Sequence, residues 1–248
     1  MNPPVSPPIT KKIARKRTTT EPQAGAELSV QDWETIFREI STAPSVASYT
    51  ASVNAIADHL PGAEPFRVLI ATIISLRTRD EVTLPAAERL LARAETPAAV
   101  AGMPLEEIER LIYPAGFYRT KAHTISRVSR IIEEKHGGVV PSTLEELKDL
   151  PGVGLKTANL VLAIGFGIPA ICVDTHVHRI ANRMGWIAAA TPDATGEALE
   201  KILPQEYWIP INQWLVAFGR TICTPGRPWC SRCPVYSWCD RVNVSRSR

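Results

Sequence analysis

The sequence predicts an all-α fold, on three observations. From about residue 29 to about residue 220, apolar residues recur three and four positions apart, which is the spacing of a helix that buries one face. No segment alternates apolar and polar residues for long enough to indicate a β-sheet. Residues 66–76 (FRVLIATIISL) are too apolar for a surface helix, so we expect this helix to lie in the centre of the protein.

The first predicted helix begins near Ser29. Ser29 and Asp32 form an approximate capping box, in which each side chain accepts a hydrogen bond from the backbone of the other residue. The apolar positions of this helix are Val30, Trp33, Ile36, Phe37 and Ile40. Residues 1–28 are rich in proline, threonine and basic residues and lack apolar periodicity, so we expect them to be disordered.

Apolar stripes predict the helices that follow. One stripe consists of Leu105, Ile108, Leu111 and Ile112, and another consists of Ile125, Val128, Ile131 and Ile132. Gly137 and Gly138 then form a typical helix stop. Ser142 and Glu145 form a second capping box, ahead of a helix that carries Leu144, Leu147 and Leu150.

Composition excludes two classes of protein. The 248 residues are 45% hydrophobic and 21% charged, as in an ordinary globular protein with a core. The longest apolar run, residues 160–173, is broken by glycine and proline and is shorter than the roughly 20 residues of a membrane-spanning helix. No apolar segment follows the N-terminal charges, as it would in a secretory signal. We therefore expect neither a membrane span nor export.

The net charge of +3 is unevenly distributed. Residues 1–20 contain no acidic residue, and the rest of the chain is close to neutral. The basic residues of this arm are Lys11, Lys12, Arg15, Lys16 and Arg17. Such an arm is compatible with a polyanionic partner, with a solvated tail or with a targeting peptide.

Four of the five cysteines lie near the C-terminus with the spacing C-x6-C-x2-C-x5-C. They are Cys223, Cys230, Cys233 and Cys239. Without a secretory signal, thiols at such short spacing indicate metal ligands rather than disulfides. Zinc sites usually contain two short-spaced pairs, whereas only the middle pair is short here. A wrapped loop around an iron–sulfur cluster tolerates longer gaps, so the spacing favours a cluster, with zinc as the alternative.

Two further residues in or near this region have simpler interpretations. Cys172 lies in an apolar run and is expected to be a buried small hydrophobic residue. Arg227 lies within the cysteine loop, where it could contact a phosphate or remain solvated.

Residues 150–154 (LPGVG) join two predicted helices through a link that contains Gly152 and Gly154. The glycines let the backbone turn tightly and expose consecutive N–H groups, directly before a helix N-terminus. Such groups can hold a phosphate without reading a base. Helix hairpins also require glycine for steric reasons alone, so the link indicates phosphate binding only together with its neighbours.

Lys156 and Asp174 are the candidate catalytic residues. Lys156 lies in the first turn of the helix after the hairpin, where the helix dipole disfavours a cation. If partly buried, its ammonium should lose a proton more readily and become a nucleophile that can form a Schiff base. Asp174 begins the next helix, either as an N-cap or as an ionised carboxylate that stabilises positive charge. A solvated lysine and a purely structural N-cap are the alternatives.

Together these residues resemble a known family. The segment LPGVGLKTANLVLAIGFGIPAICVDTHVHRIANR, followed by the four-cysteine loop, is similar to the endonuclease III family of helix–hairpin–helix DNA glycosylases. AGFYRTKA at 115–122 is also similar to a family segment, and the resemblance covers roughly residues 30–240. By position, it implies catalytic roles for Lys156 and Asp174. It further implies DNA contacts by Gly152, Val153 and Gly154, and a [4Fe–4S] cluster on Cys223, Cys230, Cys233 and Cys239.

The family's fold implies two helical lobes with an active-site cleft between them. Residues 58–168 would form a six-helix lobe that contains the helix–hairpin–helix motif. Residues 29–57 and 169–248 would together form the second lobe, with the iron–sulfur cluster loop at 223–239. Residues 1–28 would be a disordered basic tail.

The family's chemistry implies a bifunctional DNA glycosylase and AP lyase that removes oxidised pyrimidines. The damaged base is turned out of the duplex, Lys156 attacks the sugar, and the resulting Schiff base permits strand cleavage by β-elimination. The implied partner is double-stranded DNA with damaged pyrimidines or abasic sites, and the protein would be a monomer. It would be cytoplasmic and nucleoid-associated in a prokaryote, or nuclear or mitochondrial in a eukaryote.

Arg77 departs from the family's pattern. Bacterial members often carry a glutamine at this position that fills the gap left by the flipped base. The planar guanidinium of Arg77 could enter the base stack, pair with the orphaned base or contact phosphate only. The preferred opposite base and the substrate range are therefore left open, but the reaction type is not.

Two other functions are kept as alternatives. One is a monofunctional mismatch adenine glycosylase, a branch that usually lacks the lysine and adds a C-terminal domain, whereas nine residues follow Cys239 here. The other is a non-catalytic helical DNA-binding module with a structural metal site formed by the four cysteines. The presence of both Lys156 and Asp174 argues against the second.

Overall fold

The computed structural model describes residues 28–49 and 65–248. Within these ranges the chain is helical and contains no β-strand, which confirms the all-α prediction. The helices before residue 170 are α1 (Val30–Ser41), α2 (Pro44–Ala47), α4 (Pro65–Ser75), α5 (Asp80–Arg93), α6 (Pro97–Ala101), α7 (Leu105–Ile112), α8 (Tyr118–His136), α9 (Leu144–Lys148) and α10 (Leu155–Leu160). A π-helical turn, Val161–Gly165, continues α10. The later helices are α11 (Thr175–Met184), α12 (Pro192–Glu200) and α13 (Pro210–Thr221), and short 3-10 turns occupy Gln205–Tyr207, Cys230–Arg232 and Tyr236–Trp238.

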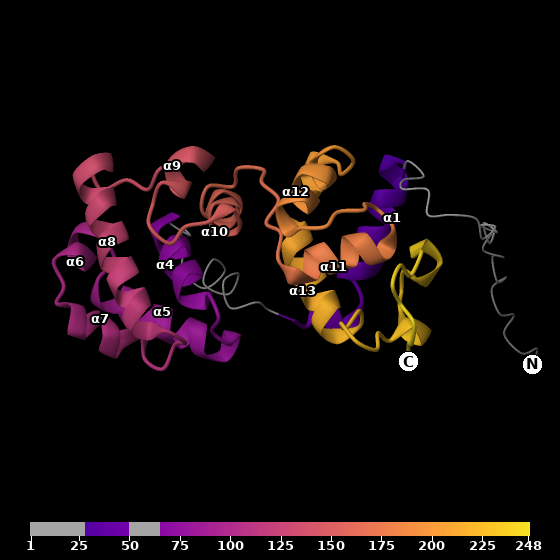
Figure 1. Cartoon of the computed structure of the whole chain (residues 1–248), viewed down its shortest axis with the longest axis horizontal. Helices are drawn as coiled ribbons and strands as arrows, with labels where there is room; N and C mark the ends of the chain where they lie inside the picture. The colour runs from indigo at the N-terminus through magenta and orange to yellow at the C-terminus, as the bar shows by residue number, and fades with distance from the viewer. Residues whose placement is uncertain (1–27, 50–64) are drawn as a thin grey trace, which may run out of the picture.

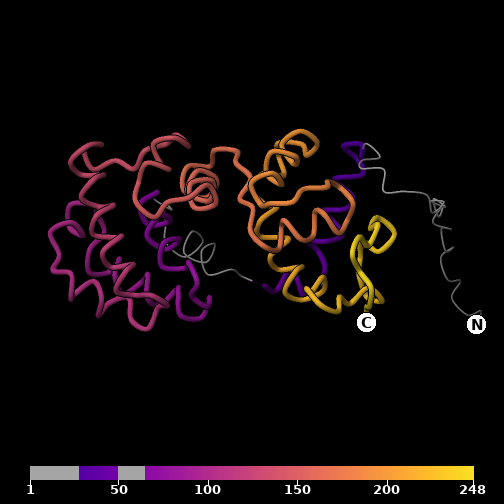
Figure 2. Tube along the Cα trace, in the orientation of Figure 1, coloured from indigo at the N-terminus to yellow at the C-terminus, as the bar shows by residue number. Residues whose placement is uncertain are grey.

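The buried apolar residues form two separate cores (Figure 1). One core lies within α4 to α10, which we call the first lobe. The other lies within α1, α2, α11, α12 and α13 and the loop after α13, which we call the second lobe. The N-terminal helix therefore packs with the C-terminal helices, and the chain passes between the lobes after α10 (Figure 2).

One predicted lobe boundary falls within the described residues. Core membership changes from the first lobe at Ala170 to the second at Ile171, close to the predicted boundary after 168. The boundary near 58 and the basic tail lie outside the described residues, apart from Leu28. The division into 29–57, 58–168 and 169–248 therefore stays a prediction.

Helix α4 is the centre of the first lobe. Eight of its 11 residues are buried, and it packs against α5, α8, α10 and the π-helical turn. This confirms the expectation from the apolar segment 66–76. Because α4 is fixed on several sides, the loop at its C-terminal end projects from a rigid base.

Helix α1 begins with the predicted capping box. The backbone N–H of Ser29 donates to Asp32 Oδ2 at 3.0 Å, and that of Asp32 donates to Ser29 Oγ at 3.2 Å. Val30 belongs to the predicted apolar stripe of α1 but is 61% exposed, since it is the first residue of the helix.

The cap of α9 is shifted by one residue from the prediction. Thr143 accepts from the Glu146 N–H in place of the predicted Ser142 and Glu145 pair. Both pairs fit the same sequence pattern, so the pattern alone does not choose between them.

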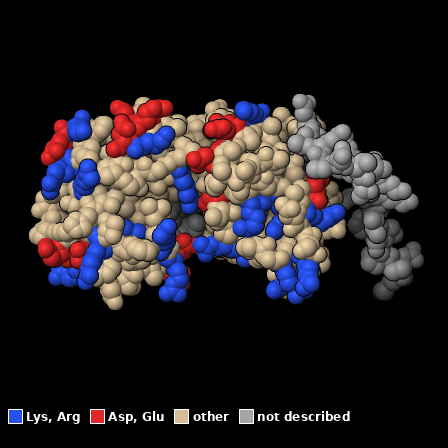
Figure 3. Space-filling model, viewed as in Figure 1, with Lys and Arg blue, Asp and Glu red and all other residues tan. Residues whose placement is uncertain are grey.

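The surface of the described residues carries charge on both lobes. On the face shown in Figure 3, basic side chains lie on each lobe close to the junction between them. No helix in the described ranges is long and apolar enough to cross a bilayer.

Candidate functional site

The hairpin between α9 and α10 contains two glycines that serve different purposes. Gly152 has a φ of +76°, and a Cβ there would lie 2.9 Å from Thr124 Cγ2, so this position requires glycine. Gly154 is the N-cap of α10 with an ordinary φ of −96°, and a Cβ there would meet nothing within 4 Å. No contact within the described protein therefore requires a glycine at 154. Its effect is to leave the backbone before α10 bare toward solvent.

Val153 has an internal role in the same hairpin. Its side chain is buried in the core of the first lobe, and its N–H donates to the Leu150 carbonyl at 3.1 Å. The Val153 N–H is thus engaged within the turn, and the predicted DNA contacts of Gly152, Val153 and Gly154 stay predictions. Val153 anchors the turn that presents Gly152 and Gly154.

Lys156 lies in the first turn of α10, as predicted, but its side chain is exposed rather than partly buried. Helix α10 buries Thr157, Ala158 and Leu160, and the long Lys156 side chain reaches solvent beside them. The Lys156 carbonyl accepts a hydrogen bond from the buried thiol of Cys172, with 3.6 Å between sulfur and oxygen. The amine is thus accessible while its backbone is held.

Asp174 is the N-cap of α11, as the sequence predicts. Its Oδ1 accepts hydrogen bonds from the N–H groups of His176 at 2.8 Å and Val177 at 2.9 Å. The carboxylate is only partly exposed, and the positive end of the helix dipole lies beside it. Because both of these bonds use Oδ1, the helix end engages one of the two carboxylate oxygens.

Residues 166–174, which we call the crossover segment, connect the helix of Lys156 to the helix of Asp174. One asparagine side chain from each lobe donates a hydrogen bond to a backbone carbonyl of this segment. Asn159 of α10 donates to the Ile171 carbonyl at 2.9 Å, and Asn212 of α13 donates to the Cys172 carbonyl at 3.0 Å. The crossover segment is therefore fixed to both lobes at adjacent residues.

The buried Cys172 and the half-buried His176 both lie within the electrostatic range of Lys156 and Asp174. Burial raises the pKa of Cys172 to about 12; the charge of Lys156 lowers this pKa and that of Asp174 raises it. Burial also lowers the pKa of His176, on which Asp174 acts in the raising direction and Lys156 in the lowering direction. An amine and a carboxylate from different lobes thus act on the same two side chains, which sequence alone could not establish.

Arg77 lies in the loop between α4 and α5 and is exposed. Its φ is +53°, a left-handed conformation that is uncommon for a residue with a side chain. The guanidinium carbon lies 5.7 Å from the centre of the Phe117 ring, which is 64% exposed and also left-handed, with a φ of +57°. Sequence reasoning missed Phe117, although an aromatic residue directly after a glycine in AGFYRTKA is a signal for an exposed turn.

Besides the crossover segment, a group of three side chains joins the two lobes, and the sequence did not predict it. Arg220 of α13 forms an ion pair with Asp80 at the start of α5, with 2.9 Å between Nη2 and Oδ2. Tyr49, after α2, donates its hydroxyl to the same Oδ2 at 2.9 Å, and the Arg220 guanidinium lies over the Tyr49 ring. Burial, together with the Asp80 hydrogen bond, raises the pKa of Tyr49 to about 12. This group joins the two lobes on the side of α5 and α13.

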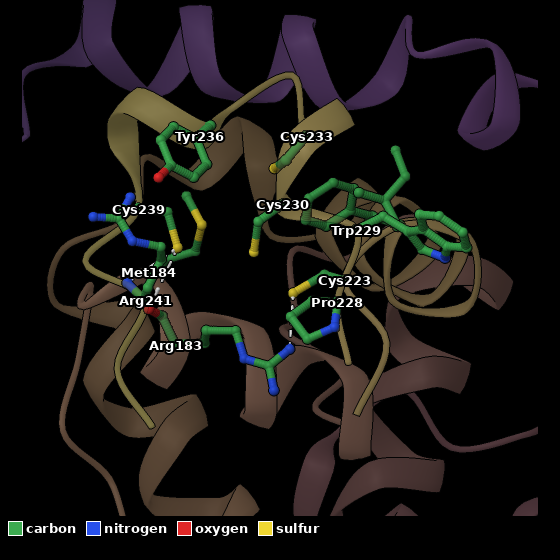
Figure 4. Close-up of a pocket in the computed structure, with 12 residues that line it drawn as sticks. Arg183, Met184, Cys223, Pro228, Trp229, Cys230, Cys233, Tyr236, Cys239 and Arg241 are labelled. Carbon is green, nitrogen blue, oxygen red and sulfur yellow. Dashed lines mark hydrogen bonds between the residues drawn. The ribbon is translucent and has the colours of Figure 1, made fainter. Parts of the chain in front are cut away.

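The four C-terminal cysteines line one pocket (Figure 4). In the part of the chain that the structure describes, no three potential ligands are close enough to hold a single metal ion. Burial raises the pKa of Cys233 to about 12 and that of Cys239 to about 11.

The end of α11 is bonded to this cysteine loop. Arg183 Nη1 lies 3.3 Å from Cys223 Sγ and 2.9 Å from the Thr224 carbonyl, and its Nη2 donates to the Pro225 carbonyl at 3.0 Å. The Arg241 N–H donates to Cys239 Sγ at 3.3 Å. Sulfur atoms with N–H donors nearby are typical of thiolates that bind a cluster.

The remaining two predictions concern single residues of this region. Cys172 is 1% exposed, which confirms it as a buried small residue apart from the other four cysteines. Arg227 is exposed in the cysteine loop, and its carbonyl accepts from Thr224 Oγ1 at 2.9 Å.

Comparison with known proteins gives a consistent result. The family model described as "HhH-GPD superfamily base excision DNA repair protein" matches residues 70–205. The chain is 52% identical over 177 residues to endonuclease III of Thermotoga maritima, a match that covers 71% of this chain and 83% of that one. It is 41% identical over 231 residues to the chloroplastic endonuclease III homolog 2 of Arabidopsis thaliana, covering 87% of this chain and 59% of that one.

A solved structure of endonuclease III has a similar fold. A trapped covalent intermediate of endonuclease III with DNA superimposes with a TM-score of 0.73 at 33% identity, and the match covers 86% of this chain and 97% of that one. The chain therefore belongs to the endonuclease III family, the DNA glycosylases and AP lyases of base excision repair within the HhH-GPD superfamily.

Proposed function

We propose that this protein removes damaged pyrimidines from double-stranded DNA and cuts the strand at the resulting abasic site, with Lys156 as nucleophile and Asp174 as its carboxylate partner. One observation carries this proposal: the crossover segment, whose Cys172 thiol donates to the Lys156 carbonyl, leads directly into the N-cap Asp174, so an accessible amine of one lobe and a carboxylate of the other flank the same short segment. An amine and a carboxylate at the junction of two lobes are the groups that this reaction needs.

The first half of the reaction is a displacement at the sugar. The damaged nucleotide must leave the stack, because its C1′ is inaccessible inside the duplex. The Lys156 Nζ lone pair then forms a bond to C1′, while the glycosidic bond breaks and its electron pair leaves with the base, which takes up a proton. The Asp174 carboxylate stabilises the positive charge that develops on the sugar.

The second half cuts the strand. The sugar ring then opens: the C1′–O4′ bond breaks, O4′ keeps the electron pair and takes up a proton, and a protonated Schiff base forms between Nζ and C1′. Removal of a proton from C2′ then lets the C3′–O bond break, and the 3′ phosphate leaves with its electron pair. Hydrolysis of the Schiff base returns Lys156 as a free amine. A lysine nucleophile thus accounts for both activities at one site.

The surfaces around this pair have the properties of a DNA-binding face. Gly152 and Gly154 leave the backbone bare before α10, where N–H groups and the helix dipole suit a phosphate. Arg77 and Phe117 project next to each other from the first lobe, and we propose that they enter the space left by the extruded base. Arg227 of the cysteine loop would contact a phosphate.

We further infer that Cys223, Cys230, Cys233 and Cys239 hold a [4Fe–4S] cluster. Four thiols from one loop that line one pocket, together with N–H donors from Arg183 and Arg241 to two of the sulfurs, support such a cluster. When bound, the cluster would supply a rigid cross-link for the loop. The reaction steps above use only the chain's own residues.

We propose that the protein acts as a monomer and is located with its DNA. In a prokaryote this is the nucleoid, and in a eukaryote the nucleus or the mitochondrion. The adenine glycosylase alternative is disfavoured by Lys156, and the non-catalytic alternative by the convergence of Lys156 and Asp174.

Borohydride trapping tests the role of Lys156. Wild-type protein mixed with duplex DNA that contains one abasic site should give a covalent adduct on reduction, because borohydride reduces the Schiff base to a stable amine. Lys156→Ala should give none, while Lys201→Ala, which removes another exposed lysine, should trap like wild type. An adduct of equal yield from Lys156→Ala would disprove the assignment.

The two hairpin glycines provide a matched pair for the phosphate contact. Gly152→Ala should lower the free energy of unfolding by about 1–3 kcal/mol, because its backbone is left-handed and Thr124 occupies the space. Gly154→Ala should destabilise by about 1 kcal/mol or less, yet weaken binding to undamaged duplex about 10-fold by obstructing a phosphate. Urea unfolding and salt-dependent DNA titrations measure the two effects. Unchanged DNA affinity in Gly154→Ala would remove the hairpin from the interface.

Absorption and metal analysis test the cluster. Protein purified without exposure to oxidants should be yellow-brown and contain iron and acid-labile sulfide in equal amounts, whereas zinc would leave it colourless. Cys230→Ser should lose most of both, and Cys172→Ala should keep them, because Cys172 lies outside the pocket. We expect Cys230→Ser to reduce folding or DNA affinity more than the single-turnover rate of bound substrate. Colourless wild-type protein with bound zinc would rule out the cluster.

A further inference from the structure

Lys121 is a buried charged residue that the proposed chemistry does not use. It lies in the first turn of α8 and is only 6% exposed. Its Nζ donates to the Ile74 carbonyl and to Thr78 Oγ1, both at 2.6 Å. A buried ammonium is costly unless it is well hydrogen-bonded, and bonds that involve a charge are stronger than neutral ones. These two acceptors therefore stabilise the buried Lys121 ammonium.

The two acceptors of Lys121 lie at the base of the loop that carries Arg77. Ile74 belongs to the last turn of α4, and Thr78 lies between Arg77 and α5. The Thr78 N–H donates to the Ser75 carbonyl at 3.0 Å, which closes the loop on itself. Lys121 thus bonds to both ends of a loop whose central residue projects into solvent.

Thr78 also joins this loop to the one that carries Phe117. Its Oγ1 accepts from the Gly116 N–H at 3.1 Å as well as from Lys121. The loops touch at Gly116, where a Cβ would lie 2.5 Å from the Arg77 carbonyl oxygen, so the contact requires glycine. A single hydroxyl therefore connects the lysine, the Arg77 loop and the Phe117 loop.

Both projecting residues are in a conformation that needs support. Arg77 and Phe117 have φ values of +53° and +57°, and a left-handed residue with a side chain costs about 1–2 kcal/mol. Such conformations persist where the surrounding structure holds them in place. The hydrogen bonds of Lys121 and Thr78 reach both loops from the protein side.

We propose that Lys121 is a positioning residue that, through the Ile74 carbonyl and the Thr78 hydroxyl, holds the loops of Arg77 and Phe117 in the shape that supports an opened base pair. This rests on the proposed function, in which these loops enter the DNA. Lys121 itself touches neither the substrate nor the reacting atoms. Burial lowers the pKa of Lys121 to about 8, so the ammonium remains mostly charged at neutral pH and can donate to both acceptors.

The test compares two DNA substrates that differ in their need for the loops. One duplex carries an oxidised pyrimidine in a normal base pair, and the other carries the same lesion opposite an abasic analogue, where no pair is opened and no orphaned base needs support. The variants are Lys121→Met, Thr78→Val and Thr78→Ser. Single-turnover excision rates are measured at saturating enzyme, and thermal unfolding is measured for each variant.

We expect the excision rate to fall on the paired lesion and to change little on the unpaired lesion. Lys121→Met and Thr78→Val should excise the paired lesion about 10-fold more slowly, the equivalent of one or two lost hydrogen bonds, and the unpaired lesion within about 2-fold of wild type. Thr78→Ser retains the hydroxyl and should restore the paired rate. Thr78→Val keeps the test decisive should Lys121→Met fail to fold, because Thr78 is only partly buried.

Two outcomes would overturn the proposal. Equal slowing on both substrates would assign Lys121 a general structural role, and wild-type rates on both would leave the loops independent of it. Failure of the proposed function would look different, since wild-type protein would then excise neither lesion and form no adduct with borohydride.

Discussion

The two hydrogen bonds to the crossover segment are the interaction on which the site depends. Lys156 and Asp174 belong to helices of different lobes with separate cores, so neither core alone sets the distance between them. Asn159 and Asn212 hold adjacent carbonyls of the segment that connects these helices, one from each lobe. Since buried backbone carbonyls need a partner, this pair of bonds satisfies the segment and fixes it at the same time.

The second lobe extends this constraint toward the cysteine loop. Helix α11 carries Asp174 at its N-terminus and Arg183 near its C-terminus, and Arg183 bonds to three groups of the cysteine loop. One helix of ten residues therefore connects the Asp174 carboxylate to the cysteine loop. In the proposed function, a bound cluster would hold the cysteine loop at the C-terminal end of this helix and would take no part in the reaction steps.

The sequence was most informative where one physical rule applied alone. The all-α fold, the central position of α4, the N-caps at Ser29 and Asp174, and the buried state of Cys172 follow from periodicity, capping chemistry and hydropathy. It was less informative where two equivalent patterns overlapped, as at Ser142 and Thr143. The sequence also did not predict whether a single side chain is exposed or buried. Lys156 is exposed and Val153 is buried because of the way α10 and the hairpin pack on the first lobe.

Contacts between residues far apart in the chain could not be predicted from the sequence either. Lys121 is separated from Ile74 by 47 positions, and Arg220 lies far from Asp80 in the chain, so no local pattern connects them. The sequence around Phe117 indicates an exposed turn, but it does not indicate that Arg77 lies beside the Phe117 ring. Residue patterns and the family resemblance supplied the candidate residues, whereas their arrangement in space depends on contacts between residues far apart in the chain.

The most direct measurement is a crystal structure of the wild-type protein covalently reduced onto a duplex that contains one abasic site. We predict a bond between Lys156 Nζ and C1′ of the extruded sugar, with an Asp174 carboxylate oxygen in contact with that sugar and the crossover segment still held by both amides. A bond from any other amine to C1′, or a sugar bound outside the junction of the two lobes, would contradict this assignment of the active site.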